Sequence, residues 1–172
     1  MQPMLGIRNL ALRRRPSKQH SVGAAMDIQD FLSPADAIVD VRAPDKVRLL
    51  RELSSRAASA LELDADRISG DILKREELGS TGVGGGTAIP HARIQDLKRP
   101  FGILARLRKA IEFNAIDGQP VDIVFLLLLP TTAEGGQLNA LASVARKLRN
   151  AETVRGLRRA SDNLELYRSI VT

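Results

Sequence analysis

An uninterrupted apolar run at residues 123–129 constrains the fold more than any other feature of this sequence. Together with Val121 before it and Pro130 after it, the run favours a strand over residues 121–129 that is buried on both faces. The run is far shorter than the roughly 20 residues that a membrane-spanning helix requires. A strand of this kind belongs in a sheet that is covered by helices on each side.

Alternating or extended patterns predict the other strands. Residues 37–41 and 101–107 alternate in the manner of strands, residues 87–94 are expected to be extended, and residues 114–120 form a turn around Asp117 and Gly118. These segments, together with the helices below, indicate an α/β fold, a single layered domain in which a mixed β-sheet is flanked by helices on both faces.

Apolar residues at spacings of three and four predict the helices. After a short helical stretch at residues 28–32, helices are expected at residues 44–61, 65–78, 134–148, 151–159 and 163–171. The inward faces are expected to carry Val47, Leu50, Leu53, Ala57, Ala60 and Leu61 in the first long helix, Ile68, Ile72 and Leu73 in the second, and Leu138, Leu141, Ala142, Ala145 and Leu148 in the third.

The basic charge of the chain is concentrated at its N-terminus. Residues 1–25 hold five of the 26 basic residues and none of the 20 acidic ones, so residues 26–172 are nearly neutral. We expect residues 1–25 to be a disordered tail or the product of a start assigned upstream of Met26, with an organellar transit peptide less favoured. Nothing in residues 26–172 repeats the basic and aromatic pattern of single-strand binders, so nucleic acid is not an expected partner.

The lack of cysteine narrows the possible chemistry. It excludes disulfides, cysteine-ligated metals and thiol catalysis, and it is consistent with an expected location in the reducing cytoplasm. His91 is the one histidine beyond the tail, and the carboxylates show no ligand spacing, so no metal site is expected.

A glycine-rich segment at residues 79–86 leads into the strand that carries His91. It has neither the lysine of a Walker loop nor the third glycine of a dinucleotide fingerprint, so nucleotide binding is not expected. Successive glycine N–H groups can form an anion-binding nest, and Ser80, Thr81, Arg75 and Arg93 could add donors for phosphate. Taken alone, the glycines favour a flexible surface loop without a function. Taken alone, His91 is more readily explained as an ordinary structural residue.

The sequences Leu-Gly-Ser-Thr-Gly at residues 78–82 and Ala-Ile-Pro-His-Ala at residues 88–92 change this balance. They resemble the phosphohistidine signature of IIA domains of the fructose/mannitol class in the bacterial phosphotransferase system, and most of all its nitrogen-regulatory members. The resemblance continues at residues 72–77, 113–122 and 144–148. It implies that residues 26–172 form one such IIA domain.

The resemblance also implies a function. His91 would accept a phosphoryl group from a phosphohistidine carrier protein of the HPr type, without a cofactor, and phosphorylation would change which regulatory targets bind. Residues expected to stabilise the phosphate are Arg75, Ser80, Thr81, Gly82 and Gln137. Residues expected to dock partners are Val83, Gly84, Gly85, Gly86, Ile89, Leu138 and Leu141.

Gln137 departs from the family pattern, because similar proteins carry a second histidine at this position. An amide can donate a hydrogen bond but cannot bring positive charge to a phosphate. Three versions of the function therefore stay open: a regulatory phosphocarrier, a binding protein with weakened phosphotransfer, and the IIA component of a sugar permease that feeds a IIB domain. A weak homo-oligomer also stays open.

Overall fold

The computed structural model describes residues 26–132 and 136–172, apart from the side chains of residues 136 and 137. The expected tail at residues 1–25 lies outside the described residues. No helix in the described part of the chain is long and apolar enough to cross a membrane.

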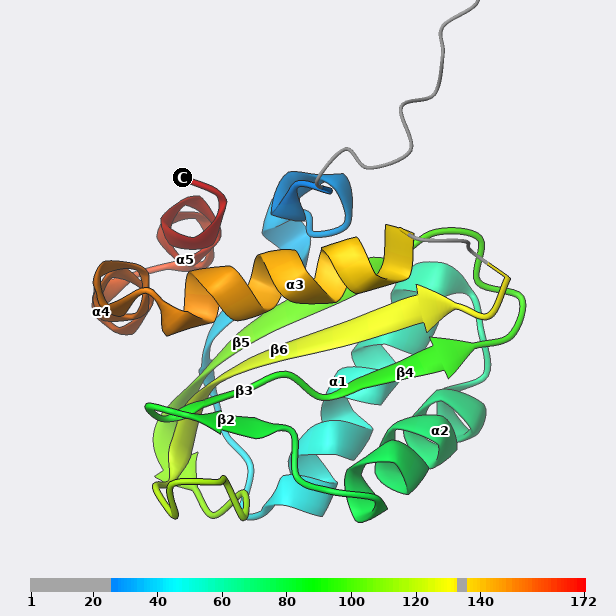
Figure 1. Cartoon of the computed structure of the whole chain (residues 1–172), viewed down its shortest axis with the longest axis horizontal. Helices are drawn as coiled ribbons and strands as arrows, with labels where there is room; N and C mark the ends of the chain where they lie inside the picture. Colours follow the sequence, from blue (N-terminus) through cyan, green and yellow to red (C-terminus); the bar gives the residue numbers. More distant parts are fainter. Residues whose placement is uncertain (1–25, 133–135) are drawn as a thin grey trace, which may run out of the picture.

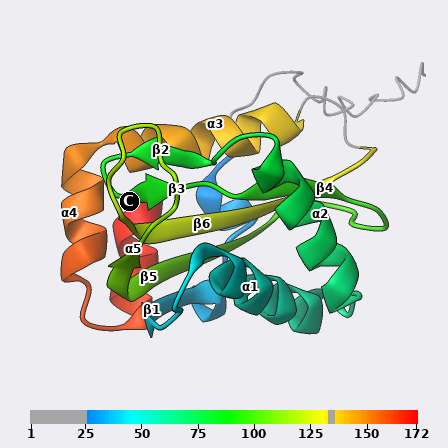
Figure 2. The same cartoon turned by 90° about the horizontal axis from the view of Figure 1, so that it is seen from below.

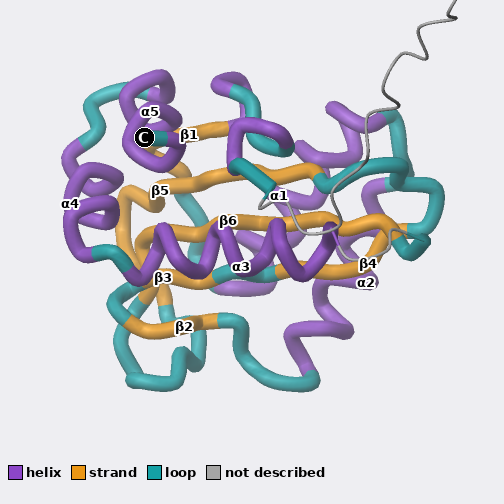
Figure 3. The backbone as a smooth tube through the Cα atoms, turned by 45° about the horizontal axis from the view of Figure 1, so that its top comes forward, coloured by secondary structure: helices purple, strands orange, loops and turns teal. Residues whose placement is uncertain are grey.

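The core of the fold is one mixed sheet. Its strands are β1 (Ala37–Val41), β2 (Gly82–Gly84), β3 (Thr87–Ala88), β4 (His91–Ile94), β5 (Phe101–Ile111) and β6 (Val121–Pro130). The order is β1-β5-β6-β3-β2, and β4 also pairs with β6, in line with β3 (Figure 3). The β5–β6 and β2–β3 pairs are antiparallel, whereas β1–β5 and both β3 and β4 with β6 are parallel.

Helices cover both faces of the sheet, as the sequence predicts. The helices are α1 (Lys46–Leu61), α2 (Ala65–Glu77), α3 (Gly136–Arg149), α4 (Ala151–Arg159) and α5 (Asn163–Val171), with short 3₁₀ turns at Ile28–Asp30 and Pro34–Asp36. Figure 1 shows α3, α4 and α5 on one side of the sheet and α1 and α2 on the other, and Figure 2 shows α1 and α2 packed together beneath it.

Strand β6 contributes to two cores, which explains its continuous apolar run. Val124, Leu126 and Leu128 pack with α1 and α2, whereas Ile123, Phe125 and Leu127 pack with α3, α4 and α5. Successive side chains of a strand point to opposite faces, so residues 123–129, which are covered on both faces, are all apolar.

The predicted inward faces of α1 and α3 are partly wrong. On α1, Val47 and Ala60 are exposed, and the buried face instead includes Leu49 and Ala58. On α3, Leu138 is 74% exposed and Ala142 is exposed, whereas Ala140 and Val144 are buried. The predicted Leu50, Leu53 and Ala57 of α1 and Leu148 of α3 are buried, so the predicted faces are correct in part.

Two strand boundaries also differ from the sequence prediction. Strand β5 continues to Ile111 rather than ending at Leu107, and residues 82–84, expected to be part of a glycine-rich loop, form the edge strand β2. Glycine lacks the side chain on which strand propensity depends, so the sequence gives little signal for β2.

Candidate phosphoryl-acceptor site

His91 is the first residue of β4, where its backbone pairs with Leu127 of the buried strand β6. The half-buried imidazole places Nδ1 2.8 Å from the carbonyl oxygen of Ile89. A carbonyl can only accept a hydrogen bond, so Nδ1 of the neutral ring carries the proton and Nε2 keeps its lone pair. The fold therefore selects the nitrogen that is able to act as a nucleophile.

A pocket of about 400 Å³ lies beside this ring. Helix α2 and strand β4 contribute its polar side chains, and strand β6 and helix α3 contribute apolar ones. The lining residues are Asp71, Arg75, His91, Ala92, Arg93, Leu129, Leu138 and Leu141. Two arginines and one histidine thus line a partly apolar pocket.

Arg75 is the predicted phosphate-stabilising residue that the structure brings to His91. It lies in the last turn of α2, and its Nη1 donates a hydrogen bond of 3.1 Å to the carbonyl of Gly79. Its positive charge is close enough to lower the pKa of His91. The same charge would attract a phosphoryl group bound to this ring.

The pKa of His91 is lowered from the ordinary value of 6.5, chiefly because burial disfavours the charged ring. The Ile89 hydrogen bond opposes this effect, Arg75 adds to it, and Glu76 opposes it more weakly. A lowered pKa means that the ring is neutral at pH 7 and becomes protonated only at more acidic pH. We expect an NMR titration of His91 to show a midpoint below pH 6.5, and Arg75→Ala to raise it. A wild-type midpoint at or above 6.5 would contradict this assignment.

The hydroxyl groups of Ser80 and Thr81 donate hydrogen bonds within the fold. Ser80 Oγ donates to the carbonyl of Phe113 at 2.7 Å, and Thr81 Oγ1 donates to a carboxylate oxygen of Glu76 at 2.6 Å. Neither residue lines the pocket beside His91, and Ser80 lines a separate hollow between α1 and α2. Their direct contact with phosphate stays a prediction.

Gly82 lies where the chain passes close to Ala115. A Cβ atom at this position would lie 2.7 Å from the Cβ and 2.8 Å from the Cα of Ala115, a contact that side chains do not tolerate. We expect Gly82→Ala to lower the free energy of unfolding by about 2 kcal/mol through overpacking, measured by urea denaturation. Gly79→Ala is the matched control, because nothing lies within 4 Å of its added methyl group. Equal stability of the two variants would show that this contact is not tight.

The turn at Gly84, Gly85 and Gly86 uses its glycines for positive φ angles of 97°, 64° and 76°. The N–H of Gly85 donates to the carboxylate of Asp117 at 2.9 Å. The carbonyl of Gly85 accepts a 2.7 Å hydrogen bond from Arg158, which also pairs with Asp122. Neighbouring side chains therefore hold the turn in place. The N–H of Gly85 is already bonded to the Asp117 carboxylate and does not point to a free anion site.

The predicted docking residues differ in their exposure. Val83 and Leu138 are exposed large apolar side chains, Gly85 is exposed, and Gly84 and Leu141 are partly exposed. Gly86 and Ile89 are buried. The accessible part of the predicted surface thus consists of the β2 turn and the first turns of α3.

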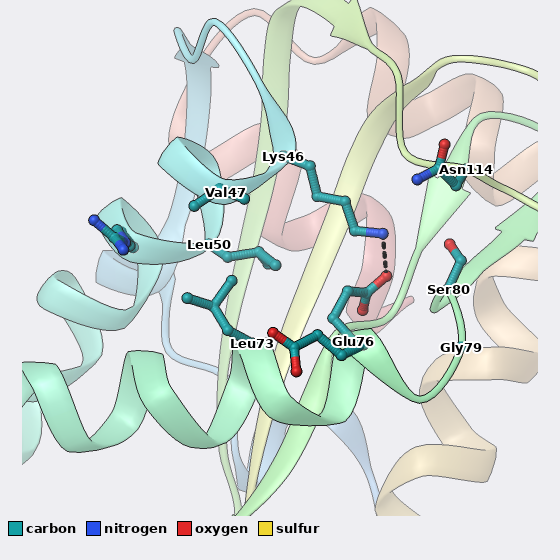
Figure 4. A pocket seen from close by; sticks show the side chains of 10 residues that line it. Lys46, Val47, Leu50, Leu73, Glu76, Gly79, Ser80 and Asn114 are labelled. Carbon is teal, nitrogen blue, oxygen red and sulfur yellow. Dashed lines mark ion pairs between the residues drawn. The ribbon is translucent and has the colours of Figure 1, made fainter.

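Sequence reasoning missed Glu76 and Lys46. The Glu76 side chain is buried and forms an ion pair of 2.6 Å with Lys46 Nζ (Figure 4). One signal was available, because Glu76 continues the buried face of α2 at a spacing of four after Ile68 and Ile72. A carboxylate on such a face needs a positively charged or hydrogen-bonding partner nearby.

Residues 30–172 match the family described as phosphoenolpyruvate-dependent sugar phosphotransferase system, EIIA 2. The chain belongs to this family. The match covers α2, the strand with His91 and α3, so the pocket described above lies within the family domain.

Similar proteins include nitrogen regulators. This IIA domain is 39% identical over 142 residues to a nitrogen regulatory protein of Bradyrhizobium diazoefficiens, covering 83% of this chain and 93% of that protein. It is 40% identical over 131 residues to the nitrogen regulatory protein of Escherichia coli, covering 76% of this chain and 80% of that protein.

Solved structures share the fold of this IIA domain. The nitrogen regulatory protein IIA-Ntr from Neisseria meningitidis superposes with a TM-score of 0.79 at 33% identity, covering 84% of this chain and 99% of that one. The mannitol IIA of Escherichia coli has a TM-score of 0.69 at 14% identity, covering 81% of this chain and 98% of that one, and this similarity concerns the fold alone.

Gln137 belongs to the first turn of α3. Its side chain lies outside the described residues. Its predicted contact with phosphate therefore stays a prediction for this IIA domain.

Proposed function

We propose that this IIA domain is a phosphocarrier in which Nε2 of His91 accepts a phosphoryl group from a phosphohistidine protein of the HPr type. The single observation that carries the proposal is the hydrogen bond from Nδ1 to the carbonyl of Ile89, which leaves the lone pair on Nε2. The adjacent pocket, with Arg75 and Arg93 in its lining, supports it. Transfer of this kind requires no cofactor.

The proposed transfer balances without an additional acid or base. The Nε2 lone pair of His91 forms a bond to phosphorus while the bond between phosphorus and the donor histidine breaks and leaves its electron pair on the donor nitrogen. The proton on Nδ1 of His91 stays in its hydrogen bond to Ile89, and the donor ring keeps the proton on its other nitrogen. The donor therefore leaves as neutral imidazole, and the guanidinium of Arg75 offsets the charge on the phosphoryl oxygens.

We propose a mainly regulatory role, with cytoplasmic targets, because the proteins that cover most of this chain at 39% and 40% identity carry the name nitrogen regulatory protein. Phosphorylation would add negative charge at the pocket beside His91, where the apolar side chain of Leu138 is 74% exposed. The phosphorylated and unphosphorylated forms would then differ in charge at this apolar surface. A protein that docks there would bind the two forms with different affinities.

The test is transfer from a phosphorylated HPr-type protein. We expect the chain to take up one acid-labile phosphoryl group per molecule. No uptake at any donor concentration would overturn the proposal.

A Gln137→His arm of the same assay tests the binding-protein alternative. A markedly faster uptake by Gln137→His would favour weakened phosphotransfer in the wild type. Equal rates would favour the phosphocarrier. Onward transfer to a IIB domain would favour the permease component instead.

A further inference from the structure

We propose that Glu76, paired with Lys46, is a positioning residue that holds His91 and Arg75 in place for phosphoryl acceptance. The expected effect of Glu76 on phosphoryl transfer rests on the proposed function. Its expected effect on the His91 ring rests only on hydrogen bonds in the unphosphorylated protein. Neither residue lines the pocket beside His91. Both act through the segment that follows α2.

Glu76 holds Thr81 with both of its carboxylate oxygens. Oε1 accepts a hydrogen bond of 2.9 Å from the backbone N–H of Thr81, and Oε2 accepts one of 2.6 Å from its hydroxyl. Both residues are buried, at 8% and 5% exposure, so water competes little for these bonds. The carboxylate therefore closes residues 76–81 into a rigid connection between α2 and β2.

Thr81 transmits this restraint to the imidazole through two further hydrogen bonds. Its carbonyl accepts a bond of 2.9 Å from the N–H of Ile89. The carbonyl of Ile89 in turn lies 2.8 Å from Nδ1 of His91. A continuous chain of short hydrogen bonds thus runs from Glu76 to the ring and ends at the group that selects its tautomer.

The same connection holds Arg75. Its guanidinium donates to the carbonyl of Gly79, which lies inside the segment that Glu76 closes. The N–H of Gly79 donates to the backbone carbonyl of Glu76 at 3.2 Å, so the acceptor is fixed from two sides. Arg75 and Glu76 are successive residues of α2, and one lines the pocket while the other anchors the chain beneath it.

Lys46 supplies the charge that a buried carboxylate requires. Its Nζ lies 2.6 Å from Oε1 of Glu76 (Figure 4). The same Nζ donates a 3.0 Å hydrogen bond to the carbonyl of Phe113 and lies 4.5 Å from the centre of the Phe113 ring. Ser80 donates to the same carbonyl. Lys46 of α1 and the carbonyl of Phe113 after β5 therefore help to fix the position of the Glu76 carboxylate.

The test removes both charges together, because a single change would leave an unpaired buried charge. The variant is Lys46→Met with Glu76→Gln, and Glu77→Gln is the control, since Glu77 is the exposed neighbour on the same turn. The first readout is the ¹⁵N chemical shifts of His91 in the unphosphorylated protein. We expect the wild type and the control to show Nδ1 protonated and Nε2 unprotonated, and the double variant to show a mixture of both tautomers.

The second readout is the rate of phosphoryl uptake by the folded protein. We expect the double variant to be about tenfold slower at saturating donor with an unchanged KM for the donor, because a misoriented nucleophile reacts more slowly once the donor is bound. A purely stabilising role predicts a lower melting temperature with the tautomer and rate of the wild type, and that result would overturn the inference. The tautomer needs no donor, so it decides the inference even if the wild type takes up no phosphoryl group.

If the double variant does not fold, Thr81→Val decides the question. It removes the hydroxyl donor to Glu76 and keeps the shape and the backbone N–H of Thr81. We expect the same shift in tautomer with a smaller amplitude. A wild-type tautomer in folded Thr81→Val would overturn the inference.

Discussion

His91→Ala is expected to abolish phosphoryl uptake from an HPr-type donor, because the variant lacks the imidazole that lines the pocket with Arg75. The chain contains only two histidines, so His20→Ala is a matched control and should be labelled at the wild-type rate. The measurement is acid-labile radiolabel per chain over time. Circular dichroism should show that both variants are folded. The loss of label in His91→Ala can then not be explained by unfolding.

Equal labelling of His91→Ala and the wild type would place the acceptor elsewhere in the chain. Loss of label in His20→Ala, with His91→Ala unaffected, would assign the acceptor to the N-terminal segment. Both results would contradict the proposed site.

Arg75→Ala is expected to slow phosphoryl uptake by about 100-fold, the size of effect seen when one preorganised donor to a developing anion is removed. Arg75 lines the pocket and its charge contributes to lowering the pKa of His91, so this charge acts where the phosphoryl group would bind. Arg75→Lys should recover part of the rate, because lysine keeps the charge but lacks the planar set of donors. The measurement is the single-turnover rate at saturating donor.

Arg155→Ala is the control for the loss of a positive charge. Arg155 is exposed on α4 and pairs only with Glu152 among the described residues, so its removal should leave the rate unchanged. If Arg75→Ala and Arg155→Ala behave alike, the charge of Arg75 does not take part in transfer.

The sequence predicted the layers of the fold because its strongest signals are long and periodic. The apolar run of β6 and the helix spacings at residues 65–78 and 163–171 each correspond to an observed element. The extent of the buried faces of α1 and α3 was less predictable, because Val47 and Leu138 fit the apolar spacing but lie exposed near the starts of their helices. Strand β2 was missed because backbone pairing with β3, and not side-chain pattern, creates it.

The candidate site was predicted in part. His91 and Arg75 meet at one pocket, as the resemblance to IIA domains implied. The hydrogen bonds of Ser80 and Thr81 could not be read from sequence, because Phe113 and Glu76 become their acceptors only when α2, β2 and the segment after β5 come together. The ion pair between Lys46 and Glu76 joins two helices whose relative placement no local pattern contains.

The most direct test of the account is ³¹P–¹⁵N NMR of the phosphorylated protein with ¹⁵N-labelled histidine. We predict that phosphorus is coupled to Nε2 of His91 and that Nδ1 remains protonated, because the carbonyl of Ile89 holds that proton. Phosphorus bonded to Nδ1 of His91, or to any other residue, would contradict the account.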